Sequence, residues 1–179
     1  MRSGWRSPIV LLPAFASLPV FLFPSCTAPG TAPGAVEGEV KKVADGDTLT
    51  LVTRDGTRLK VRLYGIDAPE IRHESQPGQP YGEEAKDALE KKISRRIVRL
   101  DIVERDPYER TVAIVFLGTR VINEEMVKEG FAWAYRKYLH GPYASGFIGA
   151  ENEAREKKRG LWNQPNPTPP WEFKREAWR

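Results

Sequence analysis

Alternating apolar and polar residues predict a β-hairpin early in the chain. Apolar residues alternate with polar ones over residues 49–53 and 59–66, as in half-buried strands. The connection between these segments contains Arg54-Asp55-Gly56-Thr57, and Asp-Gly between two strands is a strong hairpin signal. Because a hairpin turns the chain back on itself, we expect the residues before its first strand to lie beside those after its second.

The same patterns predict three further strands and three helices. We expect the strands over residues 36–43, 97–103 and 111–117, and the helices over residues 83–93, 124–129 and 145–158. Asn123 is expected to cap the second helix. Five strands with a helix between the third and the fourth is the plan of the OB-fold. The predicted fold class is therefore α+β: a five-stranded OB-fold β-barrel with about three helices packed on it.

Composition divides the chain into four segments. We expect a signal peptide over residues 1–26, a flexible linker over 27–35, the folded domain over 36–163, and a proline-rich, charged, disordered tail over 164–179. A hydrophobic content of 40% supplies enough apolar side chains for a core, which excludes a wholly disordered chain.

The N-terminus has the pattern of an export signal, with a basic start, an apolar run over residues 9–23, and small polar residues after it. A permanent transmembrane anchor is the alternative, but the run contains two prolines and is shorter than the about 20 apolar residues of a full span. Cys26, the only cysteine, lies where bacterial lipoproteins carry their lipid; simple cleavage near Ala28 or Ala35 is the other interpretation. Both predict a bacterial protein that is secreted, periplasmic or lipid-anchored at the envelope.

The net charge says little about a partner. The whole chain carries a formal +4, but residues 1–35 contain two arginines and no acid. The remainder therefore has 26 basic residues (28 minus 2) against 24 acidic ones, a net of only +2. Attraction to nucleic acid has to come from local clustering.

The predicted hairpin gathers acids and an arginine at its open end. Asp47 precedes the first strand, Asp67 and Glu70 follow the second, and Arg62 projects from the returning strand. Three carboxylates and a guanidinium at one end of a small sheet suit a hard cation and a phosphate.

Two motifs carry a resemblance to a known family. Residues 45–51 are Asp-Gly-Asp-Thr-Leu-Thr-Leu, and after ten residues 62–70 are Arg-Leu-Tyr-Gly-Ile-Asp-Ala-Pro-Glu. A second motif, Asp-Pro-Tyr-Glu-Arg, occupies residues 106–110. Together they resemble the staphylococcal nuclease (thermonuclease) family, over roughly residues 36–163. The resemblance implies a calcium-dependent phosphodiesterase that cuts DNA and RNA and leaves 3′-phosphates.

The resemblance also implies the metal ligands. Asp47 and Asp67 match the carboxylates that bind Ca²⁺, and Ala68 matches a position that contributes its backbone carbonyl. Asp45 either caps the turn or supports the metal site from behind its ligands, and both interpretations stay open.

The catalytic positions follow in the same way. Glu70 matches the general base that acts on the attacking water, and Arg62 and Arg110 match the two guanidiniums that bind the scissile phosphate. The family commonly has a glycine where this chain has Glu109. If Glu109 points outward, catalysis survives; if it pairs with Arg110, phosphate affinity falls.

Two tyrosines are candidates for substrate contacts. Tyr108 and Tyr135 are expected to flank the pocket and touch the nucleotide, although aromatic residues beside strands more often belong to the core.

The sequence therefore predicts an exported, Ca²⁺-dependent endonuclease that hydrolyses single-stranded DNA and RNA. We expect a monomer without a protein partner, and contact with a membrane only through a lipid on Cys26. The alternative is a non-catalytic OB-fold module that binds single-stranded nucleic acid by base stacking.

Overall fold

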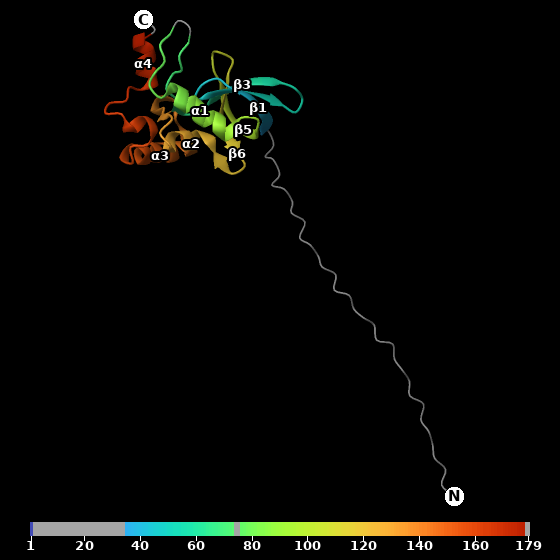
Figure 1. Cartoon of the computed structure of the whole chain (residues 1–179). Coiled ribbons are helices and arrows are strands. Elements are labelled where there is room, and N and C mark those ends of the chain that lie inside the picture. Colours follow the sequence, from blue (N-terminus) through green and yellow to red (C-terminus); the bar gives the residue numbers. More distant parts are fainter. Residues whose placement is uncertain (2–34, 74–75, 178–179) are drawn as a thin grey trace. The chain divides into compact units, whose positions relative to one another are not determined.

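The computed structural model describes residue 1, residues 35–73 and residues 76–177 (Figure 1). The predicted signal peptide and the lipid site at Cys26 lie outside the described residues. The fold below is that of the compact unit Ala32–Arg179. Within the described ranges, no helix combines the length and apolarity that a membrane span requires.

The unit is built on a β-barrel. Its strands are β1 (Val36–Val43), β2 (Thr48–Thr53), β3 (Arg58–Leu63), β5 (Ile97–Arg105) and β6 (Thr111–Leu117). They pair in the order β3-β2-β1-β5-β6, and the sheet closes because β3 also pairs with β6 in parallel. Strand β7 (Arg120–Val121) extends the sheet beyond β6, while β4 (Ile66–Asp67) pairs with β8 (Trp133–Ala134) in a separate two-stranded sheet.

Helices cover the barrel (Figure 1). They are α1 (Gly82–Ile93), α2 (Ile122–Lys128), α3 (Ala144–Glu156) and α4 (Pro170–Ala177). Helix α1 buries the face that carries Ala85, Leu89 and Ile93 against the apolar interior of the barrel, as its spacing predicts. The predicted α+β OB-fold is confirmed.

The returning strand of the hairpin is shorter than its sequence pattern suggests. We predicted a strand through Ile66, but β3 ends at Leu63. A turn follows, in which Gly65 has a φ of +72°, a conformation that favours glycine. The turn redirects the chain, so that Asp67 belongs to β4 and pairs with Trp133 of β8.

Asn123 does not cap helix α2, so that prediction was wrong. Its side chain is fully buried: it accepts a hydrogen bond from the amide of Val115 (2.8 Å) and donates to the carbonyls of Tyr64 (3.0 Å) and Ala113 (3.2 Å). These groups are 8 to 59 residues away in the sequence. Because they are buried, leaving them without hydrogen bonds would destabilise the fold more than the loss of a helix cap.

The C-terminal segment forms a helix where we predicted a disordered tail over residues 164–179. The carbonyl of Pro169 accepts hydrogen bonds from the amides of Glu172 and Phe173 (both 3.0 Å), and Pro170 takes the first helical position, where a missing N–H costs nothing. Pro170 is buried and Trp171 packs on the domain, so helix α4 is stabilised by contacts rather than by composition.

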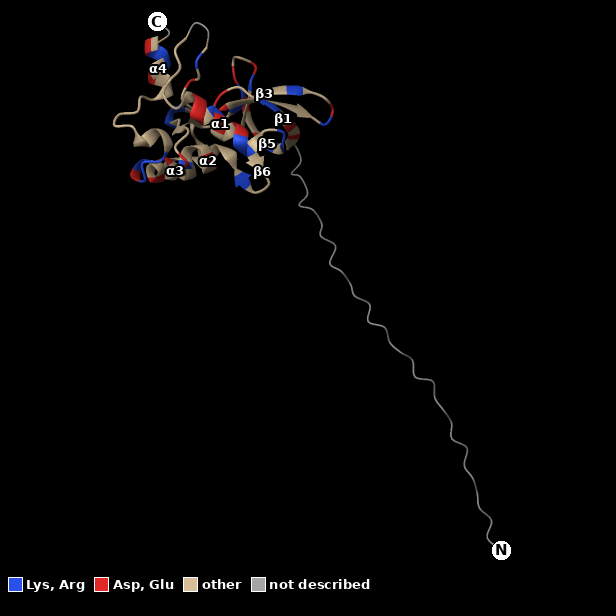
Figure 2. Ribbon diagram, in the orientation of Figure 1, with Lys and Arg blue, Asp and Glu red and all other residues tan. Residues whose placement is uncertain are grey.

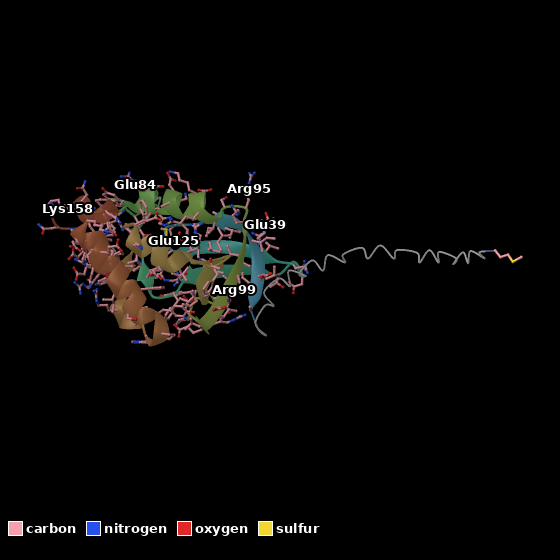
Figure 3. All side chains as sticks on the ribbon, turned by 90° about the horizontal axis from the view of Figure 1, so that it is seen from below. Glu39, Glu84, Arg95, Arg99, Glu125 and Lys158 are labelled. Atoms are coloured by element: carbon pink, nitrogen blue, oxygen red, sulfur yellow. The ribbon has the colours of Figure 1, made fainter. Side chains whose placement is uncertain are left out.

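Residues of both charge signs are spread over the helices and over strands such as β1, β3 and β5 (Figure 2). Figure 3 shows Glu39 on β1 and Arg95 after α1 toward one end of the unit, and Lys158 after α3 at the other. Because both signs are spread over the surface, charge alone does not mark a functional face, and side-chain contacts have to locate it.

Candidate active site

The residues predicted for the site converge on one cleft of ≈ 1060 Å³. Those that line it are Asp45, Arg62, Asp67, Glu70, Tyr108, Arg110 and Tyr135. The two remaining predicted residues, Asp47 and Ala68, are buried, each only 2% exposed. The cleft lies at the open end of the β2–β3 hairpin.

The loop between β1 and β2, which contains Asp47, packs closely against the chain that follows β3. A side chain at Gly46 would place its Cβ 2.7 Å from the Cβ atoms of Ala68 and Ala85, so only glycine permits this approach. The amide of Ala68 donates a hydrogen bond to Oδ2 of Asp47 (2.9 Å), and the amide of Leu63 donates to the Asp47 carbonyl (2.8 Å). Asp47 is therefore fixed by backbone groups on the far side of the hairpin.

Arg62 joins the two predicted metal-binding carboxylates. Its guanidinium donates from one terminal nitrogen to Oδ1 of Asp47 (2.5 Å) and from the other to Oδ1 of Asp67 (2.6 Å). The side chain of Arg62 is 17% exposed, and those of the two aspartates are 3% and 1% exposed. The predicted proximity of these three residues is observed.

Glu70 reaches the cleft from the loop after β4. Its carbonyl accepts a hydrogen bond from the amide of Gln79 (2.8 Å), and a Cβ on Gly82 would lie 2.1 Å from the same carbonyl oxygen. Glycine at the start of α1 therefore lets the Glu70 backbone pack against the helix. The carboxylate of Glu70 lies 2.7 Å from the ammonium of Lys174 on α4.

Burial and neighbouring charges shift the pKa values of the acids in the site. Burial, then repulsion by Asp47, raises the pKa of Asp45 from 3.8 to about 7. Burial also raises the pKa values of Asp67 and Glu70, against the opposing charge of Lys174. Burial works against the charge of Asp47 as well, but Arg62 and Lys174 outweigh it and lower its pKa. Burial thus disfavours the ionised forms of Asp45, Asp67 and Glu70 in the metal-free protein.

These residues fit a divalent cation with oxygen ligands. Within the described ranges, no three His, Cys, Asp or Glu side chains already form a ligand cluster. However, Oδ2 of Asp67 is a buried oxygen without a hydrogen-bond partner, which is costly unless something else binds it. Carboxylate and carbonyl oxygens from Asp47, Asp67 and Ala68 are the donors that Ca²⁺ prefers.

Arg110 enters the cleft from the turn between β5 and β6. Its Nε donates to Oδ2 of Asp106 (2.6 Å), and Oδ1 of Asp106 accepts the amides of Tyr108 and Arg110 (2.9 Å each). Glu109 is exposed, and the ion pair of Arg110 is with Asp106 rather than with Glu109. The backbone of Glu109 has a φ of +59°, which explains why a glycine suits this position.

The two candidate tyrosines lie in different surroundings. Tyr108 is 78% exposed at the rim of the cleft, with the guanidinium of Arg110 5.5 Å from its ring centroid. Tyr135 lies deeper and stacks on Trp171, with ring centroids 4.8 Å apart and an angle of 2° between the planes.

The sequence-based prediction missed the contribution of helix α4 to the cleft, which comes from Trp171 and Lys174. Their signal was present: they are three residues apart behind Pro169-Pro170, which places them one turn apart on a helix that begins at a proline.

Comparisons with known proteins find a matching family model and similar proteins. A family model described as Staphylococcal nuclease homologue matches residues 60–164. An "Uncharacterized endonuclease" of Haemophilus influenzae is 40% identical over 137 residues, 76% of this chain and 72% of that protein. A "Thermonuclease" of Staphylococcus hyicus is 37% identical over 127 residues (70% and 75%), and a "Micrococcal nuclease" of Shigella flexneri is 37% identical over 149 residues (78% and 81%).

Proposed function

This chain belongs to the staphylococcal nuclease family, and its relatives include a "Thermonuclease" and a "Micrococcal nuclease". We propose that it is an exported, Ca²⁺-dependent endonuclease acting on single-stranded DNA and RNA. One observation carries the proposal: the Arg62 guanidinium bridges Asp47 and Asp67 in the cleft that also contains Glu70 and Arg110.

Two carboxylates and a carbonyl would hold the metal. Asp47 and Asp67 would bind Ca²⁺ through their carboxylate oxygens and Ala68 through its backbone carbonyl, and the unpartnered oxygen of Asp67 supports this assignment. When bound, the cation supplies positive charge to a phosphate that becomes more negative as it is attacked. Asp45, whose side chain accepts the amide of Asp47 (3.0 Å), would hold that ligand in place.

Glu70 is the proposed base. In this reaction a water oxygen bonds to phosphorus and Glu70 accepts the proton that the water loses. The bond from phosphorus to the 5′ oxygen of the next nucleotide breaks, and that oxygen takes up a proton from solvent to leave as a hydroxyl. Burial raises the pKa of Glu70, which makes its carboxylate a better proton acceptor than an exposed glutamate.

Arg62 and Arg110 are the proposed phosphate ligands. They line the same cleft from β3 and from the β5–β6 turn. A planar guanidinium matches two phosphate oxygens at once and stabilises the charge that develops on them. Asp106 orients Arg110 through its Nε, so the arginine is held ready for the substrate.

Digestion of heat-denatured DNA by the purified protein, with Ca²⁺ or with excess EGTA, tests this function. We expect cleavage only with Ca²⁺, and undiminished cutting in EGTA would exclude the calcium requirement. Arg62→Ala and Glu70→Ala should each lower the rate by roughly 100- to 10,000-fold, since each removes stabilisation of the transition state. Arg54→Ala, in the exposed hairpin turn, is the matched control. Binding of single strands without cleavage would favour the non-catalytic alternative.

Export is part of the proposal and rests on the sequence. The basic start, the apolar run over residues 9–23 and the small residues after it support it. Mass spectrometry of the N-terminus of the mature protein distinguishes the two export routes. An acylated Cys26 indicates a lipid anchor, and a free N-terminus at a later residue indicates simple cleavage. An intact Met1 in the mature protein would contradict export by either route.

A further inference from the structure

Helix α4 forms one wall of the cleft, although it lies beyond residues 60–164, the part of the chain that the family model matches. Trp171 and Lys174 of this helix line the cleft together with Arg62 and Arg110. A segment from the end of the chain therefore borders the residues proposed for catalysis.

Specific contacts fix this wall. The carbonyl of Thr168 accepts a hydrogen bond from Nε2 of the buried Gln79 (2.5 Å). The ammonium of Lys174 lies 2.7 Å from Oε1 of Glu70 and 3.2 Å from Oδ1 of Asp67. The hydrogen bond at Thr168 and the ion pairs of Lys174 lie on either side of Trp171 in the sequence, and together they fix the position of its indole in the cleft.

Trp171 continues a series of aromatic rings. It stacks on Tyr135 with nearly parallel planes, and it meets Trp133 edge-on at a centroid distance of 5.6 Å. Tyr135 in turn meets Tyr138 edge-on at 4.9 Å, and Tyr138 is 48% exposed in the same cleft. The aromatic series therefore reaches from the buried Trp133 to solvent.

The position of Trp171 suits ligand contact better than packing alone. The neighbouring tryptophans Trp133 and Trp162 are buried, whereas Trp171 is only partly so. Trp171 lines both the main cleft and an adjoining hollow that is bordered by Arg136 and Lys137. An accessible ring with cationic residues beside it is the combination that binds single-stranded nucleic acid, because bases stack on the ring while the cations attract phosphates.

We propose that Trp171, supported by Tyr135, is a base-stacking residue of the substrate site, and that helix α4 is part of the nucleic-acid-binding surface. The ligand is an unpaired base near the phosphate at Arg62 and Arg110, so the proposal rests on the proposed nuclease function. Lys174 is a positioning residue that holds α4 against Glu70 and Asp67.

Binding of two labelled oligonucleotides tests this, measured by fluorescence anisotropy with Ca²⁺ present. One is oligothymidylate, and the other has the same length and phosphates but abasic sites in place of the bases. All proteins carry Glu70→Gln, which slows cleavage and retains an oxygen that accepts from Lys174. If a gel shows that this variant still cuts at the unmodified rate, the proposed function of Glu70 fails, and binding is then measured in EGTA.

Two variants of Trp171 form a matched pair. Trp171→Leu retains apolar packing without a ring, and Trp171→Phe retains a ring. We expect the leucine variant to bind oligothymidylate roughly 5- to 150-fold more weakly, the range found for stacking on one aromatic ring, with abasic binding unchanged. The phenylalanine variant should keep most of the preference for bases. Arg175→Ala, exposed on the same helix, should have no effect on that preference.

Two outcomes would overturn the proposal. An equal loss on both oligonucleotides would make Trp171 a packing residue, because a misplaced helix weakens phosphate contacts and base contacts alike. Tighter binding of both oligonucleotides by the leucine variant would mean that α4 covers the site rather than building it.

Discussion

Asp45→Asn should stabilise the metal-free protein at neutral pH. The folded protein raises the pKa of Asp45 from 3.8 to about 7, through burial and then repulsion by Asp47. An acid with a raised pKa contributes its full stability below pH 3.8 and loses it as the pH rises toward 7, because the fold disfavours the ionised form. Asparagine removes the charge and retains the oxygen that accepts the amide of Asp47.

The magnitude follows from the two pKa values. A change from 3.8 to about 7 corresponds to about 4 kcal/mol at a pH above both. Relaxation around the ionised acid reduces this upper limit, so we expect a gain in the free energy of unfolding of between about 1 and 4 kcal/mol at pH 8. The gain should vanish below about pH 4, where Asp45 is protonated in both the folded and the unfolded protein.

Urea denaturation in EDTA from pH 3.5 to 8.5 measures this gain for the variant and the unmodified protein. Asp55→Asn is the control, because hydrogen bonds from Thr53 and Thr57 lower the pKa of Asp55 in the exposed hairpin turn. The same chemical change there should not stabilise the protein at pH 8. A gain for Asp45→Asn that is the same at pH 4 and pH 8, or a loss at every pH, would refute the reasoning.

Three further predictions concern the cations of the site. Arg62→Lys should lower kcat/KM by at least roughly 100-fold, since one ammonium cannot span two aspartates and also bind phosphate in a fork; activity within a few-fold of the unmodified enzyme would contradict this. Asp106→Ala should lower kcat/KM by up to roughly 100-fold, because it releases Arg110. Asp106→Asn keeps a hydrogen-bond acceptor and should lower kcat/KM less. Equal losses of kcat/KM in the two variants would exclude the orienting role. Lys174→Ala should tighten Ca²⁺ binding roughly tenfold in calorimetry, because Asp67 loses a competing cation, and weaker binding would count against it.

The hairpin was predictable because its signals are local. Alternating apolar residues and Asp55-Gly56 define β2, β3 and the turn, and closing the hairpin brings Asp47 to Arg62 without further information. The exact end of β3 was not predictable from alternation, because the apolar pattern continues past the turn at Gly65.

Helix α4 was missed because its stabilisation comes from distant residues. Residues 164–170 contain four prolines, a composition typical of a disordered segment. The contacts that order the segment are with Gln79, Glu70 and Tyr135, which are between 36 and 104 residues away in the sequence from their partners. The same limit applies to Asn123, whose buried hydrogen bonds join three elements that only the folded chain brings together.

An excess of negative charge links the stability of the fold to its proposed metal. Four carboxylates, those of Asp45, Asp47, Asp67 and Glu70, surround the proposed metal site, and two cations, Arg62 and Lys174, form ion pairs with this group. Their formal sum is −4 + 2 = −2, the charge that one divalent cation would cancel. Asp45→Asn and Ca²⁺ therefore relieve the same repulsion by different means. Calcium should stabilise the unmodified protein increasingly as its concentration rises above the Kd, by RT ln(1 + [Ca²⁺]/Kd), and the gain from Asp45→Asn should shrink as calcium saturates the site. Fully additive gains would show that the raised pKa of Asp45 arises from its burial alone and not from the charges that the metal is proposed to balance.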